Sequence, residues 1–148
     1  MSISSVQKNI VFYVDDDIDD VQLVDEAFSK YSANIELKTA SDGIEAISSL
    51  KVMLDGGIQP CLIILDINMP RLDGRETLVR IKQIQGLKNV PVVLFSTSSQ
   101  PADEIFANKY NAGFITKPTD FTQLEAIING FINHCTNDIR EMTNKQKI

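Results

Sequence analysis

The feature that most constrains the fold of this chain is a repeated change in the spacing of its apolar residues. Continuous apolar runs end abruptly at polar residues in segments 10–14, 62–65 and 92–95. Short runs rich in β-branched and aromatic residues are typical of strands that are buried on both faces of a sheet. Segment 113–116 has the same character, whereas segment 35–39 alternates apolar and polar residues, as a half-exposed edge strand does. The sequence therefore predicts five strands.

Stripes of apolar residues at spacings of three and four follow these strands, which is the pattern of amphipathic helices. They cover segments 21–31, 44–54, 78–84, 105–110 and 124–132. Thr122 and Glu125 have the spacing of a capping box, which predicts the start of the last helix. The rings of Phe106 and Tyr110, in the weakest stripe, either form an exposed patch or pack into the core, and the sequence leaves both alternatives open.

The alternation of strands and helices predicts an α/β domain with a parallel sheet and helices on both faces. The crossovers between parallel strands are expected to be right-handed. Five such units in 148 residues fit a flavodoxin-like doubly wound fold with the strand order 2-1-3-4-5 and the alternating strand at an edge. We expect the domain to span residues 8–135, followed by a C-terminal tail at 136–148 with no output domain.

Composition and charge argue against several classes of function. The net charge is −6 and no basic stripe is present, which disfavours direct binding of nucleic acid. No apolar run reaches the roughly 18 residues of a membrane-spanning helix. The N-terminus lacks the basic start, apolar stretch and small cleavage residues of a signal peptide, so we expect a cytoplasmic protein.

The two cysteines, Cys61 and Cys135, lie far apart and show neither a CxxC nor a Cys/His spacing. The single histidine, His134, belongs to no ligand motif, so zinc binding is not expected. In a reducing cytoplasm, the sequence favours two buried free thiols.

Polar side chains collect where the predicted strands end. In an open α/β sheet, ligands bind outside the carboxyl ends of the strands. The residues expected there are Asp15, Asp16 and Asp17 after the first strand, Asp66 and Asn68 after the third, Ser96 and Thr97 after the fourth, and Lys117 and Pro118 after the fifth. The sequence thus predicts a carboxylate cluster, a hydroxyl and an ammonium at one edge of the sheet.

The charges at this edge favour a divalent cation. Asp15, Asp16 and Asp66 carry three negative charges when ionised, and Lys117 supplies one positive charge. Carboxylate oxygens, a backbone carbonyl and waters are the ligands that Mg²⁺ prefers, often together with a phosphate. Asp66, at the end of a central strand, is a plausible nucleophile, because aspartyl phosphates are established covalent intermediates. Taken singly, each of these residues could belong to an ordinary turn, since acidic runs and Lys-Pro pairs are common in turns. Their coincidence at one edge of the sheet favours a functional site.

These residues carry a resemblance to a known family. Segment 62–74, LIILDINMPRLDG, resembles the phospho-acceptor segment of response-regulator receiver domains. The acidic pair after the first strand, the hydroxyl after the fourth and the Lys-Pro pair after the fifth resemble that family too, and the likeness covers roughly residues 8–135. Segments 55–60 and 96–105 are also similar to the single-domain regulators that serve bacterial phytochromes.

The resemblance implies a role for each site residue. Asp66 would accept a phosphoryl group from the phosphohistidine of a sensor histidine kinase. Mg²⁺ would be bound by Asp66, directly by Asp16, through water by Asp15, and by the backbone carbonyl of Asn68. Lys117 would pair with Asp66 and then with the phosphate.

The same resemblance implies a conformational switch. Ser96 would be the switch hydroxyl and Phe114 the switch aromatic, and the Lys117–Pro118 peptide bond would be cis. Apart from the resemblance, we expect the face formed by the fourth helix, the fifth strand and the fifth helix to carry the signal, and a C2 homodimer is the commonest arrangement for self-association through such a face. Whether the chain passes its phosphoryl group to a histidine phosphotransfer protein is left open by the sequence.

Two other functions compete with this interpretation. A Mg²⁺-dependent phosphatase of the haloacid-dehalogenase type also uses an aspartate after a strand, but it carries a second aspartate two residues later, where this chain has Asn68. A flavodoxin needs a phosphate loop rich in Ser, Thr and Gly after its first strand. Here that place is taken by Asp15, Asp16 and Asp17, which would repel a phosphate unless a metal intervened.

Overall fold

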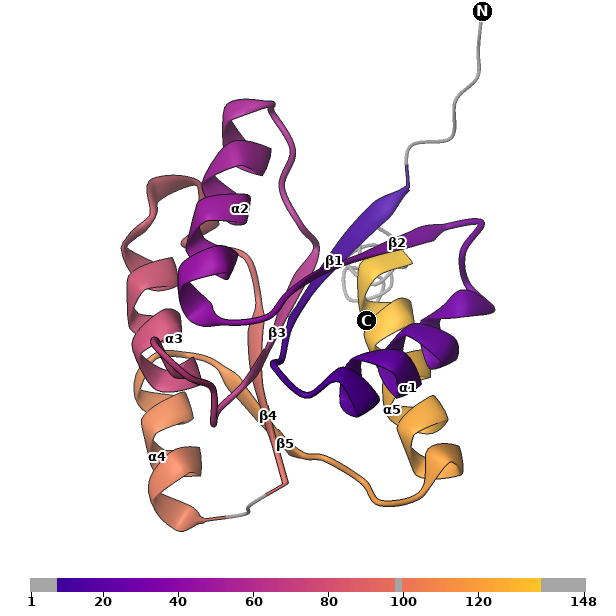
Figure 1. The fold of residues 1–148 in the computed structure, drawn as a ribbon. Coiled ribbons are helices and arrows are strands. Elements are labelled where there is room, and N and C mark those ends of the chain that lie inside the picture. The colour runs from indigo at the N-terminus through magenta and orange to yellow at the C-terminus, as the bar shows by residue number, and fades with distance from the viewer. Residues whose placement is uncertain (1–7, 98–99, 137–148) are drawn as a thin grey trace, which may run out of the picture.

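The computed structural model describes residues 8–97 and 100–136, which form a five-stranded parallel sheet (Figure 1). The strand order β2-β1-β3-β4-β5 confirms the predicted doubly wound fold. The strands are β1 Asn9–Val14, β2 Ile35–Ala40, β3 Leu62–Asp66, β4 Val92–Ser96 and β5 Gly113–Thr116. β3 is buried along its whole length and is the middle strand, between β1 and β4. Its last residue, Asp66, therefore lies midway along the carboxyl edge of the sheet.

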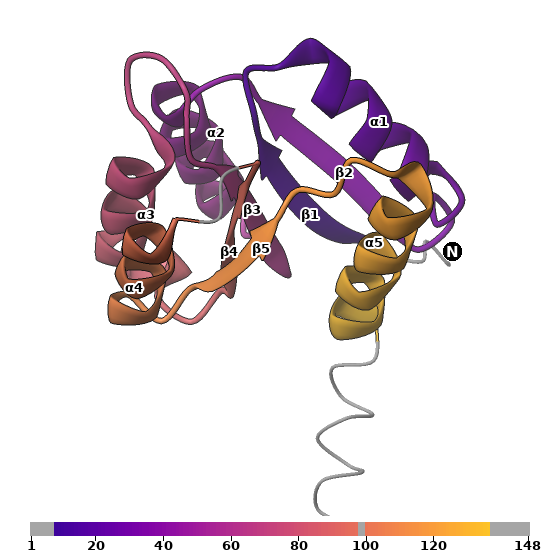
Figure 2. The same ribbon diagram turned by 90° about the horizontal axis from the view of Figure 1, so that it is seen from below.

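Helices cover both faces of the sheet. They are α1 Ile18–Ser29, α2 Gly43–Asp55, α3 Gly74–Gln83, α4 Pro101–Lys109 and α5 Phe121–Thr136, with a short 3-10 helix at Gln85–Leu87. Figures 1 and 2 show α1 and α5 on one face and α2, α3 and α4 on the other. Each face has its own core, because successive side chains of a strand point to opposite sides of the sheet: Phe12 and Ile63 pack under α2 and α3, whereas Tyr13 and Ile64 pack under α1 and α5.

Aspartates cap the helices near the carboxyl edge of the sheet. Asp17, Asp42 and Asp73 are the N-caps of α1, α2 and α3, and each carboxylate accepts a hydrogen bond from a backbone N–H of the first turn. The predicted capping box of α5 is wrong: the helix begins at Phe121, and Asp120 Oδ1 accepts the hydrogen bond of the Thr122 N–H at 2.7 Å. An aspartate is the stronger cap, so the helix starts before Thr122.

The rings of Phe106 and Tyr110 on α4 pack against the core, and they do not form an exposed patch. Phe106 and Tyr110 are half-buried, lie 4.9 Å apart between ring centroids, and pack against the core of the α2–α3–α4 face. The exposed apolar side chain of α4 is instead Ile105, which is 68% exposed.

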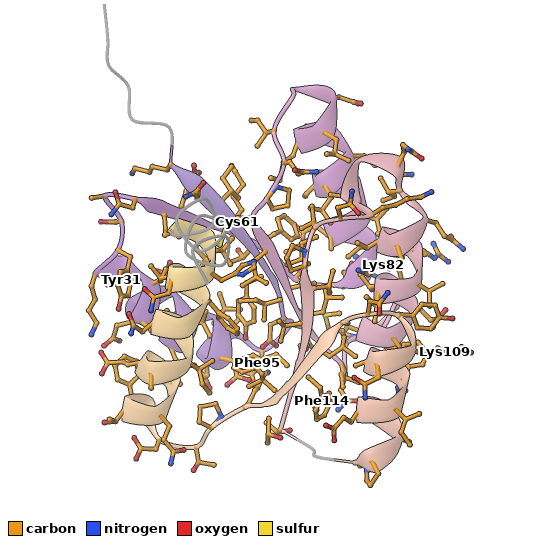
Figure 3. All side chains as sticks on the ribbon, turned by 180° about the vertical axis from the view of Figure 1, so that it is seen from behind. Tyr31, Cys61, Lys82, Phe95, Lys109 and Phe114 are labelled. Atoms are coloured by element: carbon orange, nitrogen blue, oxygen red, sulfur yellow. A yellow bond between two sulfur atoms is a disulfide. The ribbon has the colours of Figure 1, made fainter. Side chains whose placement is uncertain are left out.

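The prediction of two buried free thiols is wrong. Cys61 and Cys135 form a disulfide with a Cα–Cα distance of 5.6 Å, and the described residues contain no free cysteine. The prediction was wrong because the two residues are 74 positions apart and meet only through the packing of the end of α5 against the start of β3 (Figure 3).

In the described part of the chain, no helix is long and apolar enough to cross a membrane. Ser98 and Ser99, and the predicted tail after Thr136, lie outside the described residues.

Candidate functional site

The site is built around Asp66, the last residue of β3. The side chain of Asp66 is 10% exposed, so it lies at the surface of the sheet edge but is largely desolvated. The following loop turns back tightly, and the Gly74 N–H donates to the Ile67 carbonyl oxygen at 2.8 Å. A Cβ on Gly74 would lie 2.3 Å from the Asp66 carbonyl oxygen, so only glycine lets α3 begin this close to the end of β3.

Two further carboxylates approach Asp66 from the end of β1. Ligand atoms of Asp15, Asp16 and Asp66 all lie within 4.8 Å of one another. Asp15 is buried, whereas Asp16 is exposed. Asp17, the third acid of the run, points elsewhere, because its carboxylate caps α1 by accepting from the N–H groups of Asp19 and Asp20. The structure thus brings the predicted acidic pair together with Asp66 and separates Asp17 from it.

These three carboxylates suit a divalent cation. Their oxygens are hard, negatively charged donors, and one face of the cluster is open through the exposed Asp16. A surface cavity of about 260 Å³ lies beside the pair, and it is lined by Asp15, Asp16, residues of α1, the end of β2 and Glu45 of α2. The donor set therefore fits Mg²⁺ or a similar ion that keeps several waters. Asn68, the predicted source of a carbonyl ligand, is exposed two residues after Asp66.

Lys117, which follows β5, places its ammonium among the acids. Its Nζ lies 2.7 Å from Asp15 Oδ2 and 3.0 Å from Asp66 Oδ1, and the side chain is 8% exposed. The Lys117 backbone N–H donates to the Ser96 carbonyl oxygen at 2.7 Å, which fixes the residue beside the end of β4. The predicted lysine and nucleophile are thus in direct contact.

The electrostatics of the site raise two pKa values. Burial, followed by repulsion from Asp15, raises the pKa of Asp66 from 3.8 to about 6, although the neighbouring Lys117 acts in the opposite direction. Burial acts to lower the pKa of Lys117, but its hydrogen bonds to Asp15 and Asp20 outweigh this effect and raise that pKa above its ordinary value. Lys117 is therefore held as a cation, and the negative charge on Asp66 is disfavoured while no second cation is bound.

Sequence reasoning missed two residues of the site. The Tyr13 hydroxyl donates to Asp15 Oδ2, and Asp20 Oδ2 accepts from Lys117 Nζ at 2.8 Å. Burial and the Asp15 charge raise the pKa of Tyr13, so it stays a donor. Tyr13 could have been found, because residues two apart in a strand share a face and Asp15 follows Tyr13 by two. No sequence signal gives Asp20, whose contact depends on how α1 is rotated above the sheet.

The two predicted switch residues lie on neighbouring strands. Ser96 is buried at the end of β4, and Phe114 is paired with Leu94 in the register between β4 and β5. Phe114 is half-buried on the α4 side of the sheet (Figure 3). The structure therefore places Ser96 at the carboxyl end of β4, and Phe114 two residues before Thr116, the residue of β5 that pairs with Ser96.

The prediction of a cis Lys117–Pro118 bond is wrong. No peptide bond within residues 8–97 or 100–136 is cis. The trans form is the ordinary state of such a bond, and with it the Lys117 ammonium already reaches Asp15 and Asp66.

Comparison with known proteins agrees with this geometry. Residues 11–129 match the response regulator receiver domain. The chain belongs to the response regulator receiver family. It is 32% identical over 133 residues to response regulator Rcp1 of Synechocystis sp., a match that covers 88% of this chain and 90% of that protein.

Solved structures of receivers superpose closely on the described fold. The phosphorylated cyanobacterial phytochrome response regulator RcpA is 33% identical, with a TM-score of 0.79 over 87% of this chain and 94% of that one. The Mn²⁺-bound form of Rcp1 is 31% identical, with a TM-score of 0.74 over 84% and 92% of the two chains. The carboxylate cluster of this chain therefore lies at the carboxyl edge of a receiver fold. The response regulator receiver family acts in two-component signalling.

Proposed function

We propose that this receiver accepts a phosphoryl group on Asp66 from the phosphohistidine of a sensor histidine kinase, in a reaction that requires Mg²⁺. The observation that carries the proposal is the position of Asp66: it ends the central strand β3, belongs to a three-carboxylate cluster, and has its Oδ1 3.0 Å from the buried ammonium of Lys117. The phosphorylated and Mn²⁺-bound relatives support it, because both have close to the same fold as this chain.

In the transfer step, a carboxylate oxygen of Asp66 bonds to phosphorus as the phosphorus–nitrogen bond of the phosphohistidine breaks. The electron pair of that bond stays on the imidazole, and an acyl phosphate forms on Asp66. Lys117 neutralises charge on the transferred group, from a position already 3.0 Å from the nucleophile. Bound Mg²⁺ would be held by Asp16, by Asp15 through water and by the Asn68 carbonyl, and would offset the charge of the acids and the phosphate. Water later hydrolyses the acyl phosphate, so the chain catalyses its own phosphorylation and dephosphorylation.

The added group brings acceptor oxygens and a charge of about −1.5 to −2 to the sheet edge. Ser96 turns to donate a hydrogen bond to one of these oxygens, and Phe114 moves into the space that this leaves beside β4. The face formed by α4, β5 and α5 changes shape as a result. This face then binds the next protein of a phosphorelay or a second copy of the chain, and a bacterial phytochrome kinase is the partner suggested by the likeness to Rcp1 and RcpA.

The proposed receiver unit spans residues 8–135 and works in the cytoplasm. The phosphatase alternative finds no support in the similarities described above, and Asn68 stands where its second aspartate would be.

Intact-mass measurement after incubation with acetyl phosphate tests the proposal. We expect the wild type to gain the mass of a single phosphoryl group with Mg²⁺ present, and none with a chelator in its place. Asp66→Asn should gain nothing under either condition. Equal Mg²⁺-dependent labelling of Asp66→Asn would refute the assignment, and continuous release of phosphate without a stable adduct would favour a phosphatase.

A further inference from the structure

The ammonium of Lys117 is shared among more carboxylates than the site described above requires. Its Nζ lies 2.7 Å from Asp15 Oδ2, 2.8 Å from Asp20 Oδ2 and 3.0 Å from Asp66 Oδ1. An ammonium has three N–H donors, so these three contacts can use all of them. Asp20 is therefore a direct partner of the lysine that faces the nucleophile.

Asp20 reaches the lysine from a different element than the other two acids. Asp66 is the last residue of β3 and Asp15 directly follows β1, whereas Asp20 lies in the first turn of α1. Asp20 and Lys117 line a small cavity of about 60 Å³ together with Tyr13 and Phe95, and Asp66 does not line it. The Asp20 side chain is 31% exposed, whereas the Lys117 side chain is 8% exposed. The contact thus holds the buried lysine from the helix side of the sheet.

We propose that Asp20 is a positioning residue, which keeps the Lys117 ammonium aimed at the reacting oxygen of Asp66. This proposal rests on the proposed function, because it assigns Asp20 a part in phosphoryl transfer. When Asp66 carries a phosphoryl group, Lys117 has to follow new oxygens, and the bond to Asp20 limits how far the ammonium moves. Without Asp20, one donor is released and the ammonium samples orientations that do not face the phosphorus.

A test must distinguish this positioning role from simple stabilisation of the N-terminus of α1. A carboxylate in the first turn of a helix is stabilising whatever it contacts. Asp19 supplies a matched control, since it lies in the same turn, is exposed and carries the same charge, and its carboxylate pairs with no residue of the described chain. Asp19→Ala and Asp20→Ala therefore change the net charge and the helix terminus equally, and they differ in the contact with Lys117.

The first measurement is the initial rate of phosphorylation by acetyl phosphate with Mg²⁺. Asp20→Ala should lower the maximal rate by roughly three- to tenfold, the loss expected for one charge-assisted hydrogen bond, with little change in the acetyl phosphate concentration at half-maximal rate. Asp20→Asn retains an acceptor oxygen and should recover part of the rate, whereas Asp19→Ala should match the wild type. Equal rates for Asp19→Ala and Asp20→Ala would overturn the proposal.

The second measurement separates this proposal from the function on which it rests. The ¹⁵N NMR signal of the Lys117 ammonium, assigned by its loss in Lys117→Arg, should show restrained motion in the wild type and in Asp19→Ala. In Asp20→Ala it should show greater motion, with melting temperatures alike for the two variants. If the wild type takes up no phosphoryl group, the proposed function fails and this comparison still tests Asp20. An unchanged Lys117 signal in Asp20→Ala would overturn the positioning role.

Discussion

The two ends of β3 are held in opposite ways. At the amino end, Cys61 directly precedes the strand and is bonded to Cys135 at the end of α5. At the carboxyl end, Asp66 lies beside two further acids of the cluster, Asp15 and Asp16, and shares the Lys117 ammonium with Asp15. The amino end is thus fixed by a covalent bond, whereas the carboxyl end carries a cluster of three carboxylates beside a single ammonium.

This difference shows how one strand serves both structure and signalling. A covalent bond keeps the end of α5 against the sheet whatever the ionic conditions are. We expect the charged end to respond to a bound cation or phosphoryl group, because the raised pKa of Asp66 indicates surroundings that disfavour its negative charge. We expect changes at the carboxyl end to alter activity and metal dependence, and changes at the amino end to alter stability alone.

The largest expected effect comes from removing the cation of the charged end. Lys117→Met should lower the free energy of unfolding at pH 7 by about 3 to 5 kcal/mol, because it leaves the buried carboxylates of Asp15 and Asp66 without their positively charged partner. Added Mg²⁺ should restore part of this loss. Urea denaturation with and without Mg²⁺ measures both effects, and Lys51→Met on the exposed side of α2 is the control. A Lys117→Met protein as stable as the control would show that the ammonium does not hold this end together.

A smaller effect is expected at the amino end. Replacing both Cys61 and Cys135 by Ser should lower the free energy of unfolding by about 2 to 4 kcal/mol, since the bond closes a loop of 74 residues in the unfolded chain. The phosphorylation rate should stay within twofold of the wild type, because the cysteines lie at the opposite edge from Asp66. Denaturation under reducing conditions should reproduce the loss in the wild type. A large fall in phosphorylation rate would contradict the independence of the two ends.

The same contrast explains what the sequence could predict. The sequence could place Asp15, Asp16, Asp66 and Lys117 at one edge of the sheet because each lies at or just after the end of a strand, and the strand ends of a parallel sheet meet at one edge. The fold followed from the same alternation of apolar patterns. These features depend on local spacing, which a sequence displays.

The features that were missed depend on packing between distant elements. The disulfide joins residues 74 positions apart, and the contact of Asp20 with Lys117 depends on the rotation of α1. The N-cap of α5 was misplaced because Asp120 and Thr122 are both good caps and lie two residues apart. The cis bond was expected from the family alone, and no local pattern supported it.

The smallest of the expected effects on stability is a gain. The pKa of Asp66 is about 6 in the folded protein and about 3.8 in the unfolded chain, so between these pH values the folded protein binds more protons. Stability therefore falls as the pH rises from about 4 to about 6, and the penalty persists above pH 6. Asp15 and Asp16 add to this penalty, and Lys117 reduces it.

Asp66→Asn removes the charge and should raise the free energy of unfolding at pH 7 by about 1 to 3 kcal/mol when no Mg²⁺ is present. Below pH 4 the variant and the wild type should be equally stable. Thermal denaturation across pH 3.5 to 8 in the presence of a chelator makes the comparison. A constant difference between the two proteins over this range would show that burial and Asp15 do not disfavour the Asp66 charge.

The central claim is that the charged end of β3 exists to carry a phosphoryl group on Asp66. The most direct measurement is to treat the phosphorylated protein with borohydride, which reduces an aspartyl phosphate to homoserine, and to sequence the peptides by mass spectrometry. We predict that homoserine is found at position 66, that it depends on Mg²⁺, and that Asp15, Asp16 and Asp20 remain aspartate. Homoserine at one of those three positions, with Asp66 unchanged, would contradict the account.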